Sequence, residues 1–269
     1  MITHAHELEH HGIKGMHWGI RRFQNKDGSL TSVGLERYGV NEIKSKMREN
    51  PDGSLTYSRG YTFNRVGQQS LDVNSSGGLY VSSGKEDAAR YIKNLGPTKL
   101  NKFFGTSGDY LQHISVTDTL KVPSHKQVAD ETIRALQENS KISGALSNSI
   151  YGYLINNGSK ISSDFLKRAA TNSEGKEGQQ LAYAVSSFLG DPNYTKESKI
   201  VYEYFRKAGY DALPDIHDRL SGTSNSAMII INTDKVKIAN STPITEEVLR
   251  EAKKQVKRME KLKVSELLK

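Results

Sequence analysis

The sequence predicts an α+β protein, a mixed α/β fold, because strand-like segments come first, helical segments fill the middle and strand-like segments return. Residues 61–66 and 78–82 have the alternation and the aromatic and β-branched content of strands. Residues 124–170 instead repeat apolar side chains at intervals of three and four, as helices do. Residues 227–231 are an apolar run typical of a buried strand. A helical insertion at about residues 124–190, within one sheet whose first and last strands pair, explains this order.

The composition limits the class of protein. The 269 residues suit one large domain or two small ones, and 35% of them are hydrophobic. No segment approaches the ~18 apolar residues of a membrane span, and the first residues lack the basic-then-apolar order of a secretory signal. We therefore expect no membrane partner and no secretion by a signal peptide. The absence of cysteine excludes disulfides, thiolate metal sites and a cysteine nucleophile.

Residues 1–31 are predicted to be a recognition segment. Five of the eight histidines precede residue 18, and the only tryptophan follows them directly. Closely spaced glycines argue against a regular helix, so the apolar side chains here need another surface, in this chain or in a partner. The histidines lack the spacing of a structural zinc site, and no metal is predicted. The expected partner-binding residues are His10, His11, Met16, Trp18, Arg21 and Arg22.

Residues 32–56 are predicted to be a helix, over about residues 32–48, and a linker between two similar Asp-Gly turns. The main domain follows at residues 57–240. After its first two strands we expect a helix from Ser83 or Gly84 to about Leu95, strands at 99–104, 110–116 and 120–122, helices at 181–189 and 200–208, and strands at 210–213, 227–231 and 236–238.

Residues 241–269 are predicted to form a basic C-terminal helix that begins after Thr245. From Arg250 to Lys269 the chain has eight Lys or Arg and three Glu, an excess of +5 within a formal net charge of +8. Such a helix is either a solvated tail or a surface for an acidic partner, nucleic acid being the partner that a basic helix favours.

Residues 10–31 read H-H-G-I-K-G-M-H-W-G-I-R-R-F-Q-N-K-D-G-S-L-T. This segment resembles the H-H-G-I-x-G-M-x-W-G-x-R-R signature of many phage and prophage proteins of Gram-positive hosts. The resemblance implies a virion-associated structural or cargo protein. Its partners would be phage head or other virion proteins, and it would occupy the virion or the host bacterial cytoplasm.

Residues 57–240 resemble the ADP-ribosyltransferase-like fold on a smaller set of residues. Arg65 matches the first strand of that family, Tyr80 with Ser82 and Ser83 matches the second, and a helix with Tyr91 follows. The resemblance implies a split-sheet domain that binds NAD in a cleft. The implied cofactor-binding residues are Arg65, Tyr80, Ser82, Ser83, Tyr91 and Asn225.

One departure bears directly on activity. The family places a catalytic Glu just before the late strand, where this chain has Ser224, Asn225 and Ser226. A neutral side chain does not supply the charge that stabilises an oxocarbenium-like ribose. Asp215 and Asp218 belong to the densest acid–base cluster and are candidates to replace the Glu. The candidate catalytic residues are then Arg65, Ser82, Asp215 and Asp218.

Each candidate also has a plain structural interpretation. Arg65 would face water at a strand edge, Ser82 and Ser83 would cap a helix, the two tyrosines would be half-buried core, and residues 215–218 would be a polar loop. The missing Glu favours a virion-associated protein with a degenerate ADP-ribosyltransferase-like module and no cofactor. The alternatives are an active NAD-dependent ADP-ribosyltransferase effector and a nucleic-acid-associated protein.

Overall fold

The computed structural model describes residues 46–103, 105, 107–139, 144, 148, 163–172, 175–215, 218, 224 and 226–267. The chain divides into two units, Met1–Ser45 and Lys46–Lys269, and only the second contains described residues. This second unit is mixed α/β, as the sequence predicts, with seven α-helices and two antiparallel sheets in its described part. No helix of the described ranges combines the length and the apolar content that a bilayer crossing requires.

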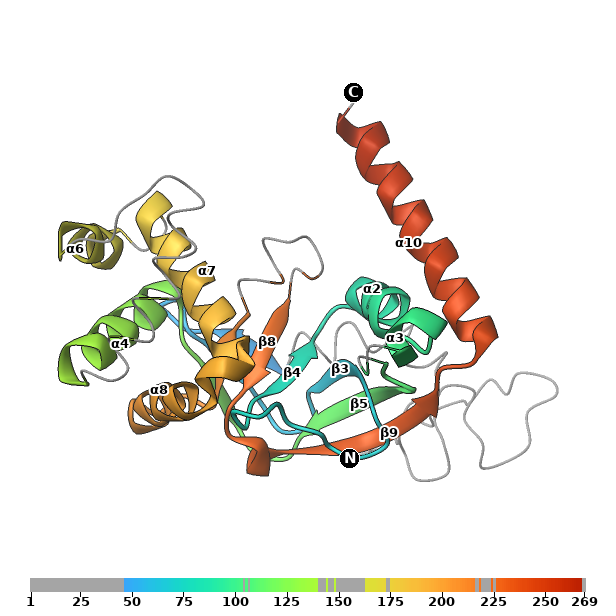
Figure 1. Ribbon diagram of the computed structural model, residues 1–269, viewed down its shortest axis with the longest axis horizontal. Helices are drawn as coiled ribbons and strands as arrows, with labels where there is room; N and C mark the ends of the chain where they lie inside the picture. The colour runs from blue at the N-terminus through green and yellow to red at the C-terminus, as the bar shows by residue number, and fades with distance from the viewer. Residues whose placement is uncertain are drawn as a thin grey trace, which may run out of the picture. The chain divides into compact units, whose positions relative to one another are not determined.

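Six strands form the larger sheet, in the order β7-β8-β4-β3-β5-β9 (Figure 1). The internal strand β8 is buried on both faces, which explains its unbroken apolar run. The strands span Thr62–Gly67 (β3), Leu79–Ser82 (β4), Tyr110–Val116 (β5), Ala212–Pro214 (β7), Ala227–Ile230 (β8) and Val236–Pro243 (β9).

Early and late strands pair in this sheet, although the first and last predicted strands do not pair with each other. β4 pairs with β8, with Ser82 opposite Ala227. β5 lies between β3 and β9 and pairs with both. The prediction of a direct first-to-last pair is therefore wrong, since β5 lies between β3 and β9.

A second sheet has three strands in the order β1-β2-β6. The helix predicted over residues 32–48 is wrong at its C-terminal end, where the chain forms a strand of this sheet. The backbone N–H of Asn50 donates to the Ser54 carbonyl at 2.8 Å, and the Ser54 hydroxyl donates to Asp52 at 2.6 Å. This turn folds the chain back so that residues 47–49 pair as a strand, and the rest of that predicted helix lies outside the described residues. The strands are Met47–Glu49 (β1), Leu55–Tyr57 (β2) and Leu120–Val122 (β6).

Four helices pack against the β7–β8 end of the large sheet (Figure 1). Leu181, Val185 and Phe188 form a buried stripe on α7, at the spacing of one helical face. Phe205 from α8 and Ile229 from β8 complete the same core. The helices are α4 (His125–Glu138), α6 (Ser163–Thr171), α7 (Lys176–Gly190) and α8 (Thr195–Lys207). A short 3-10 turn, Pro192–Tyr194 (η1), joins α7 to α8, and another, Thr233–Lys235 (η2), joins β8 to β9.

The other helices lie toward the β3–β5–β9 end (Figure 1). α2 (Lys85–Leu95) and α10 (Glu246–Leu267) share a core of Ala89, Ile92, Ala252 and Val256. α10 begins as predicted, and the Thr245 hydroxyl accepts a hydrogen bond from the Val248 backbone at 3.3 Å.

The strand predicted over residues 99–104 is wrong, since residues Lys99–Phe103 form a short helix, α3. The Thr98 hydroxyl accepts a hydrogen bond from the Asn101 backbone at 3.1 Å, and the Thr98 carbonyl accepts one from Lys102 at 3.0 Å. Thr98 thereby caps a helical turn directly after Pro97. This capping, which the apolar pattern does not reveal, overrides the strand-like content of the segment.

Candidate functional site

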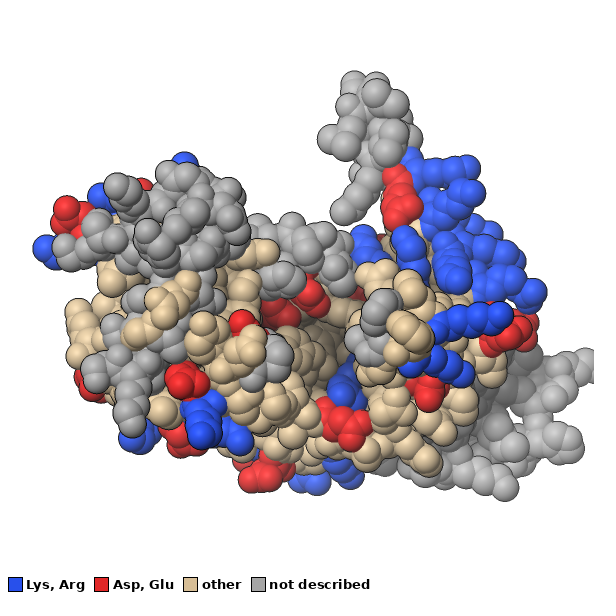
Figure 2. Space-filling model, in the orientation of Figure 1, with Lys and Arg blue, Asp and Glu red and all other residues tan. Residues whose placement is uncertain are grey.

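A cavity of about 310 Å³ opens where β3, β4, α2 and the end of β7 meet. Figure 2 shows the corresponding hollow near the middle of the face in view, with acidic and basic atoms at its margin. Among the residues named from sequence, this cavity brings together Arg65, Tyr80, Tyr91 and Asp215. It is lined by Asn64, Arg65, Val66, Asp72, Val73, Asn74, Gly78, Tyr80, Val81, Tyr91, Leu95 and Asp215.

The Arg65 guanidinium is braced by the protein rather than facing water. Its Nη1 donates to Gln112 Oε1 at 2.7 Å, and its Nη2 donates to the Asp72 carbonyl at 2.5 Å. The fully buried Gln112 in turn donates from Nε2 to the carbonyls of Gln68, at 2.6 Å, and Ser70, at 3.1 Å. Burial lowers the pKa of Arg65, and the Asp72 charge opposes this shift. Arg65 and Gln112 therefore hold the 68–72 loop at the rim of the cavity.

Two tyrosines provide neutral hydroxyl groups in the cavity. Tyr91, in the second turn of α2, donates a hydrogen bond to the Asp218 carboxylate. Burial, followed by the bond to Asp218, raises the pKa of Tyr91 well above its usual range. Burial also raises the pKa of Tyr80 on β4, with smaller contributions from Tyr202 and Asp215. Both tyrosine hydroxyl groups therefore remain protonated at neutral pH.

Asp215 places a buried carboxylate in the same cavity. It follows directly after β7, is 3% exposed, and its backbone N–H donates to the Ala227 carbonyl at 2.9 Å. Its Oδ1 accepts a hydrogen bond from the Asp218 backbone at 3.3 Å. The Asp215 carboxylate is thus linked to the Asp218 backbone, and the Asp218 carboxylate is linked to α2 through Tyr91. The buried acid therefore lies beside Ala227, the first residue of β8.

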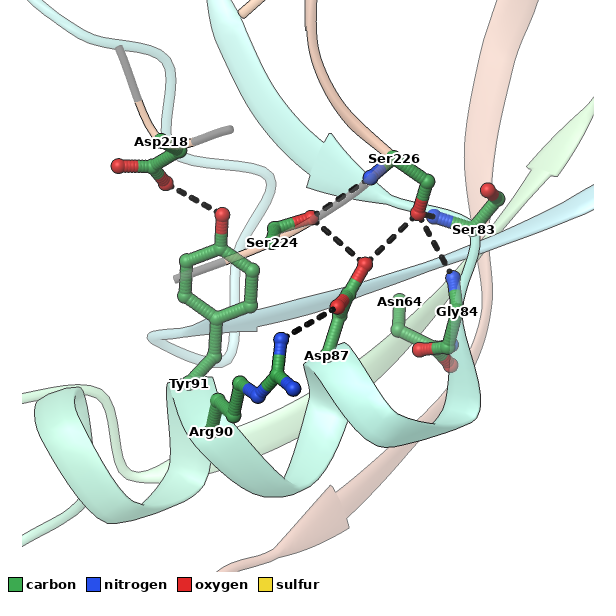
Figure 3. A network of polar contacts seen from close by, with 9 residues as sticks. All are labelled: Asn64, Ser83, Gly84, Asp87, Arg90, Tyr91, Asp218, Ser224 and Ser226. Carbon is green, nitrogen blue, oxygen red and sulfur yellow. Dashed lines mark hydrogen bonds and ion pairs between the residues drawn. The ribbon is translucent and has the colours of Figure 1, made fainter. Parts of the chain in front are cut away.

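A buried polar network beside the cavity was missed from the sequence (Figure 3). Asp87, 3% exposed in the first turn of α2, accepts hydrogen bonds from the hydroxyls of Ser224, at 2.6 Å, and Ser226, at 2.7 Å. The Ser226 hydroxyl also accepts from the backbone N–H groups of Ser83 and Gly84, both at 3.0 Å. A serine more than 140 positions along the chain therefore caps α2.

The network changes the interpretation of two predicted residues. Ser83 contributes its backbone to the network, and the residue at the helix N-cap is Gly84, which has no capping side chain. Ser82 on β4 is fully buried, its hydroxyl makes no hydrogen bond with the described residues, and it is not among the described residues that line the cavity. The predicted role of a cap for these two serines is therefore wrong.

Other predicted site residues lie outside the described residues. These are the partner-binding set from His10 to Arg22 and the cofactor-binding candidate Asn225. Within the described ranges, no group of three His, Asp or Glu side chains is arranged to hold a metal ion.

Comparisons with known proteins concern only the N-terminal segment. Residues 2–25 match a protein family described as a family of unknown function (DUF7211). No curated protein and no solved structure matches the chain. The cavity must therefore be interpreted from its own geometry.

Proposed function

We propose that residues 57–240 form an ADP-ribosyltransferase-type domain that binds NAD as its substrate, with Asp215 in place of the missing glutamate. The observation that carries this proposal is the cavity in which Arg65, Tyr80 and Tyr91 meet a buried Asp215. Three of these residues come from the strands and the helix that the family resemblance assigns to NAD. The fourth supplies the charge that the late-strand sequence lacks.

The charges of the cavity suit the nicotinamide–ribose half of NAD. Its described lining has two carboxylates, Asp72 and Asp215, and a single cation, Arg65. The nicotinamide ring is cationic, and positive charge develops on the ribose as its bond to nicotinamide breaks. A buried carboxylate stabilises such a charge far more than an exposed one does, because little water screens it. The faces of Tyr80 and Tyr91 add cation–π attraction for the ring.

The reaction then follows from these contacts. The bond between the ribose carbon and the nicotinamide nitrogen breaks, and nicotinamide leaves with the electron pair. An acceptor nucleophile bonds to the same carbon and gives its proton to a base. Asp215 stabilises the ribose cation, while Asp218 is held by the Tyr91 hydroxyl at the cavity. If water is the acceptor, the same site releases free ADP-ribose.

Labelled NAD tests this proposal. The wild-type chain should bind NAD in calorimetry and transfer label to host protein or release ADP-ribose. Asp215→Asn should lower the rate by about 10²–10³-fold, the usual loss when one charge-stabilising group is removed, with NAD affinity changed only a few-fold. Asp234→Asn, an exposed carboxylate on η2, is the matched control and should retain full activity. Absence of both binding and turnover in the wild type refutes the proposal.

A second role belongs to the N-terminal segment, which we propose docks the protein on a phage head, portal or scaffold partner. The family match, residues 2–25, lies within the separate Met1–Ser45 unit, and the phage partner follows from the resemblance of residues 10–31 to the phage signature. Aromatic and Arg side chains dominate interface energies, which makes Trp18 the expected anchor. Mass spectrometry of purified virions should detect the wild-type chain and find much less of Trp18→Ala than of the control His4→Ala. Absence of the expressed wild-type chain from particles refutes this role.

A further inference from the structure

The two faces of α10 have opposite characters. Its apolar side chains are turned toward α2, where Ala252 and Val256 are buried against Ala89 and Ile92. The helix is therefore fixed to the domain as far as Met259 rather than being a free tail from its start. Between Glu246 and Lys261 its exposed side chains are almost all charged, and Figure 2 shows basic atoms gathered along this part of the helix.

Five cations of α10 fall on one face. They recur at intervals of three and four residues, which places neighbouring members on successive turns of the same side. At 1.5 Å per residue the row is about 16 Å long. The row consists of Arg250, Lys253, Lys254, Lys257 and Lys261, all of them exposed.

The acidic neighbours neutralise this row only in part. Glu251 pairs with Lys254 at 2.8 Å, and Glu260 reaches across to Lys93 on α2 at 3.4 Å. Arg250, Lys253 and Lys257 make no ion pair within 4 Å with the described residues. The row therefore retains several cations outside direct ion pairs, and such cations favour binding to a polyanion through counterion release.

Lys99 extends the basic surface beyond the helix. Residues 97–99 and α10 enclose a groove of about 550 Å³ whose charged lining is one acid, Glu246, and five cations: Lys99, Arg250, Lys253, Lys254 and Lys257. The cations thus border a concave surface formed by two segments about 150 residues apart in the chain.

We infer that this basic row, with Lys99, binds the phosphate backbone of double-stranded DNA without reading its sequence. A straight, rigid row of cations fits a duplex, which presents one phosphate charge per about 1.7 Å of its axis. Single-strand binders place aromatic platforms among their cations, and the outward face of α10 has none. Phosphate contacts made by flexible lysines position a protein on DNA but carry no base information.

An anionic membrane is the competing occupant. Interfacial helices insert their apolar face, and that face of α10 is already packed against α2 as far as Met259. However, Leu100 and Phe103 on the adjacent α3 are 63% and 82% exposed. The experiment must therefore separate the two ligands.

Fluorescence anisotropy of the full chain with a labelled 25-base-pair duplex of arbitrary sequence tests the inference. Lys254 is paired with Glu251, which leaves five of the six cations for phosphate contacts. The logarithm of the binding constant should therefore fall with the logarithm of salt concentration with a slope near −4.5. The triple change Arg250→Gln, Lys253→Gln, Lys257→Gln should reduce this slope to about −1.8, since each lost contact removes about 0.9. It should also weaken binding at least tenfold at 50 mM salt.

A matched control removes the same charge elsewhere. Lys196, Lys199 and Lys207 are exposed on α8, and changing all three to Gln lowers the net charge equally. This control should keep a slope near −4.5. Equal losses for the two triple variants would show that only net charge matters and would overturn the assignment, as would a slope near zero for the wild type.

Vesicles of neutral and anionic phospholipid, in a 7:3 ratio, form the second arm. We expect weak co-sedimentation that Leu100→Ser and Phe103→Ser do not change. Vesicle binding tighter than duplex binding, abolished by those two changes, would overturn the inference in favour of a membrane.

Discussion

Replacing Asp87 with Asn probes whether the buried network fixes the loop before β8 to α2. The two serine hydroxyls donate to the same carboxylate oxygen, Oδ2, which the Asn amide oxygen still imitates. The substitution therefore removes charge while retaining the shape of the acceptor. It also loses the ion pair with Arg90, at 3.8 Å.

The expected cost follows from the two hydrogen bonds. A bond to a charged group contributes about 1.5–3 kcal/mol, against about 0.5–1.5 kcal/mol for a neutral one. Losing the charge assistance at two such bonds lowers the free energy of unfolding by about 2 kcal/mol. For a unit of this size that corresponds to a decrease of about 4–8 °C in melting temperature. Asp87→Ala, which leaves both hydroxyls without their acceptor, should cost about 3–5 kcal/mol.

Chemical denaturation of Asp87→Asn beside Glu86→Gln measures the effect. Glu86 is the neighbouring exposed acid in the same helical turn, so it reports the loss of a first-turn charge alone, about 0.3–1 kcal/mol. Hydrogen exchange adds a local readout, because the Ser83 and Gly84 amides donate to Ser226 and should lose protection. If Asp87→Asn costs no more than Glu86→Gln, the network does not hold this loop.

Two further predictions concern β5 and its neighbour. Burial lowers the pKa of His113, so the unfolded chain binds the proton before the folded chain does as pH falls below about 6.5. The free energy of unfolding should therefore decrease in this pH range. Denaturation curves of His113→Gln should lack this part of the pH dependence. A Cβ at Gly67 would lie 2.1 Å from Arg65 Nη1, so Gly67→Ala should cost about 1–3 kcal/mol. In an Arg65→Ala background that cost should largely disappear, and an unchanged cost would show that the clash has another origin.

Local patterns predicted most of the elements but not the edges of the sheets. β3, β4, β5, α2 and α10 were predicted within a few residues, because alternation and capping are local properties. β9 was predicted over residues 236–238 and extends to Pro243. Its second half, with Asn240 and Ser241, is polar and largely exposed, and it becomes a strand through pairing with β5. That pairing is not visible in the local sequence.

Four of the residues that line the cavity were predicted as site residues from the sequence. Arg65, Tyr80, Tyr91 and Asp215 were each named from the sequence, and they line one cavity. The Asp87 network was not predicted, because it depends on a hydrogen bond between two residues 139 positions apart in the chain. In the sequence, Asp87 is an ordinary acidic residue in the first turn of a helix. Ser226 is noted there only as one of the residues at the place where the resembled family has its Glu.

Arg65 shows why residue identity alone does not separate a ligand contact from a structural one. Its guanidinium braces Gln112 and the Asp72 carbonyl and also lines the cavity, so the protein itself already uses part of its donor fork. Arg65→Lys keeps the positive charge, but an ammonium lacks the planar fork that spans both partners. If NAD affinity depends on the charge, the Lys variant retains most of it. If NAD affinity depends on the position of the 68–72 loop, Arg65→Lys should lose nearly as much affinity as Gln112→Ala. Gln112→Ala removes the side chain that connects Arg65 to this loop and leaves Arg65 in place.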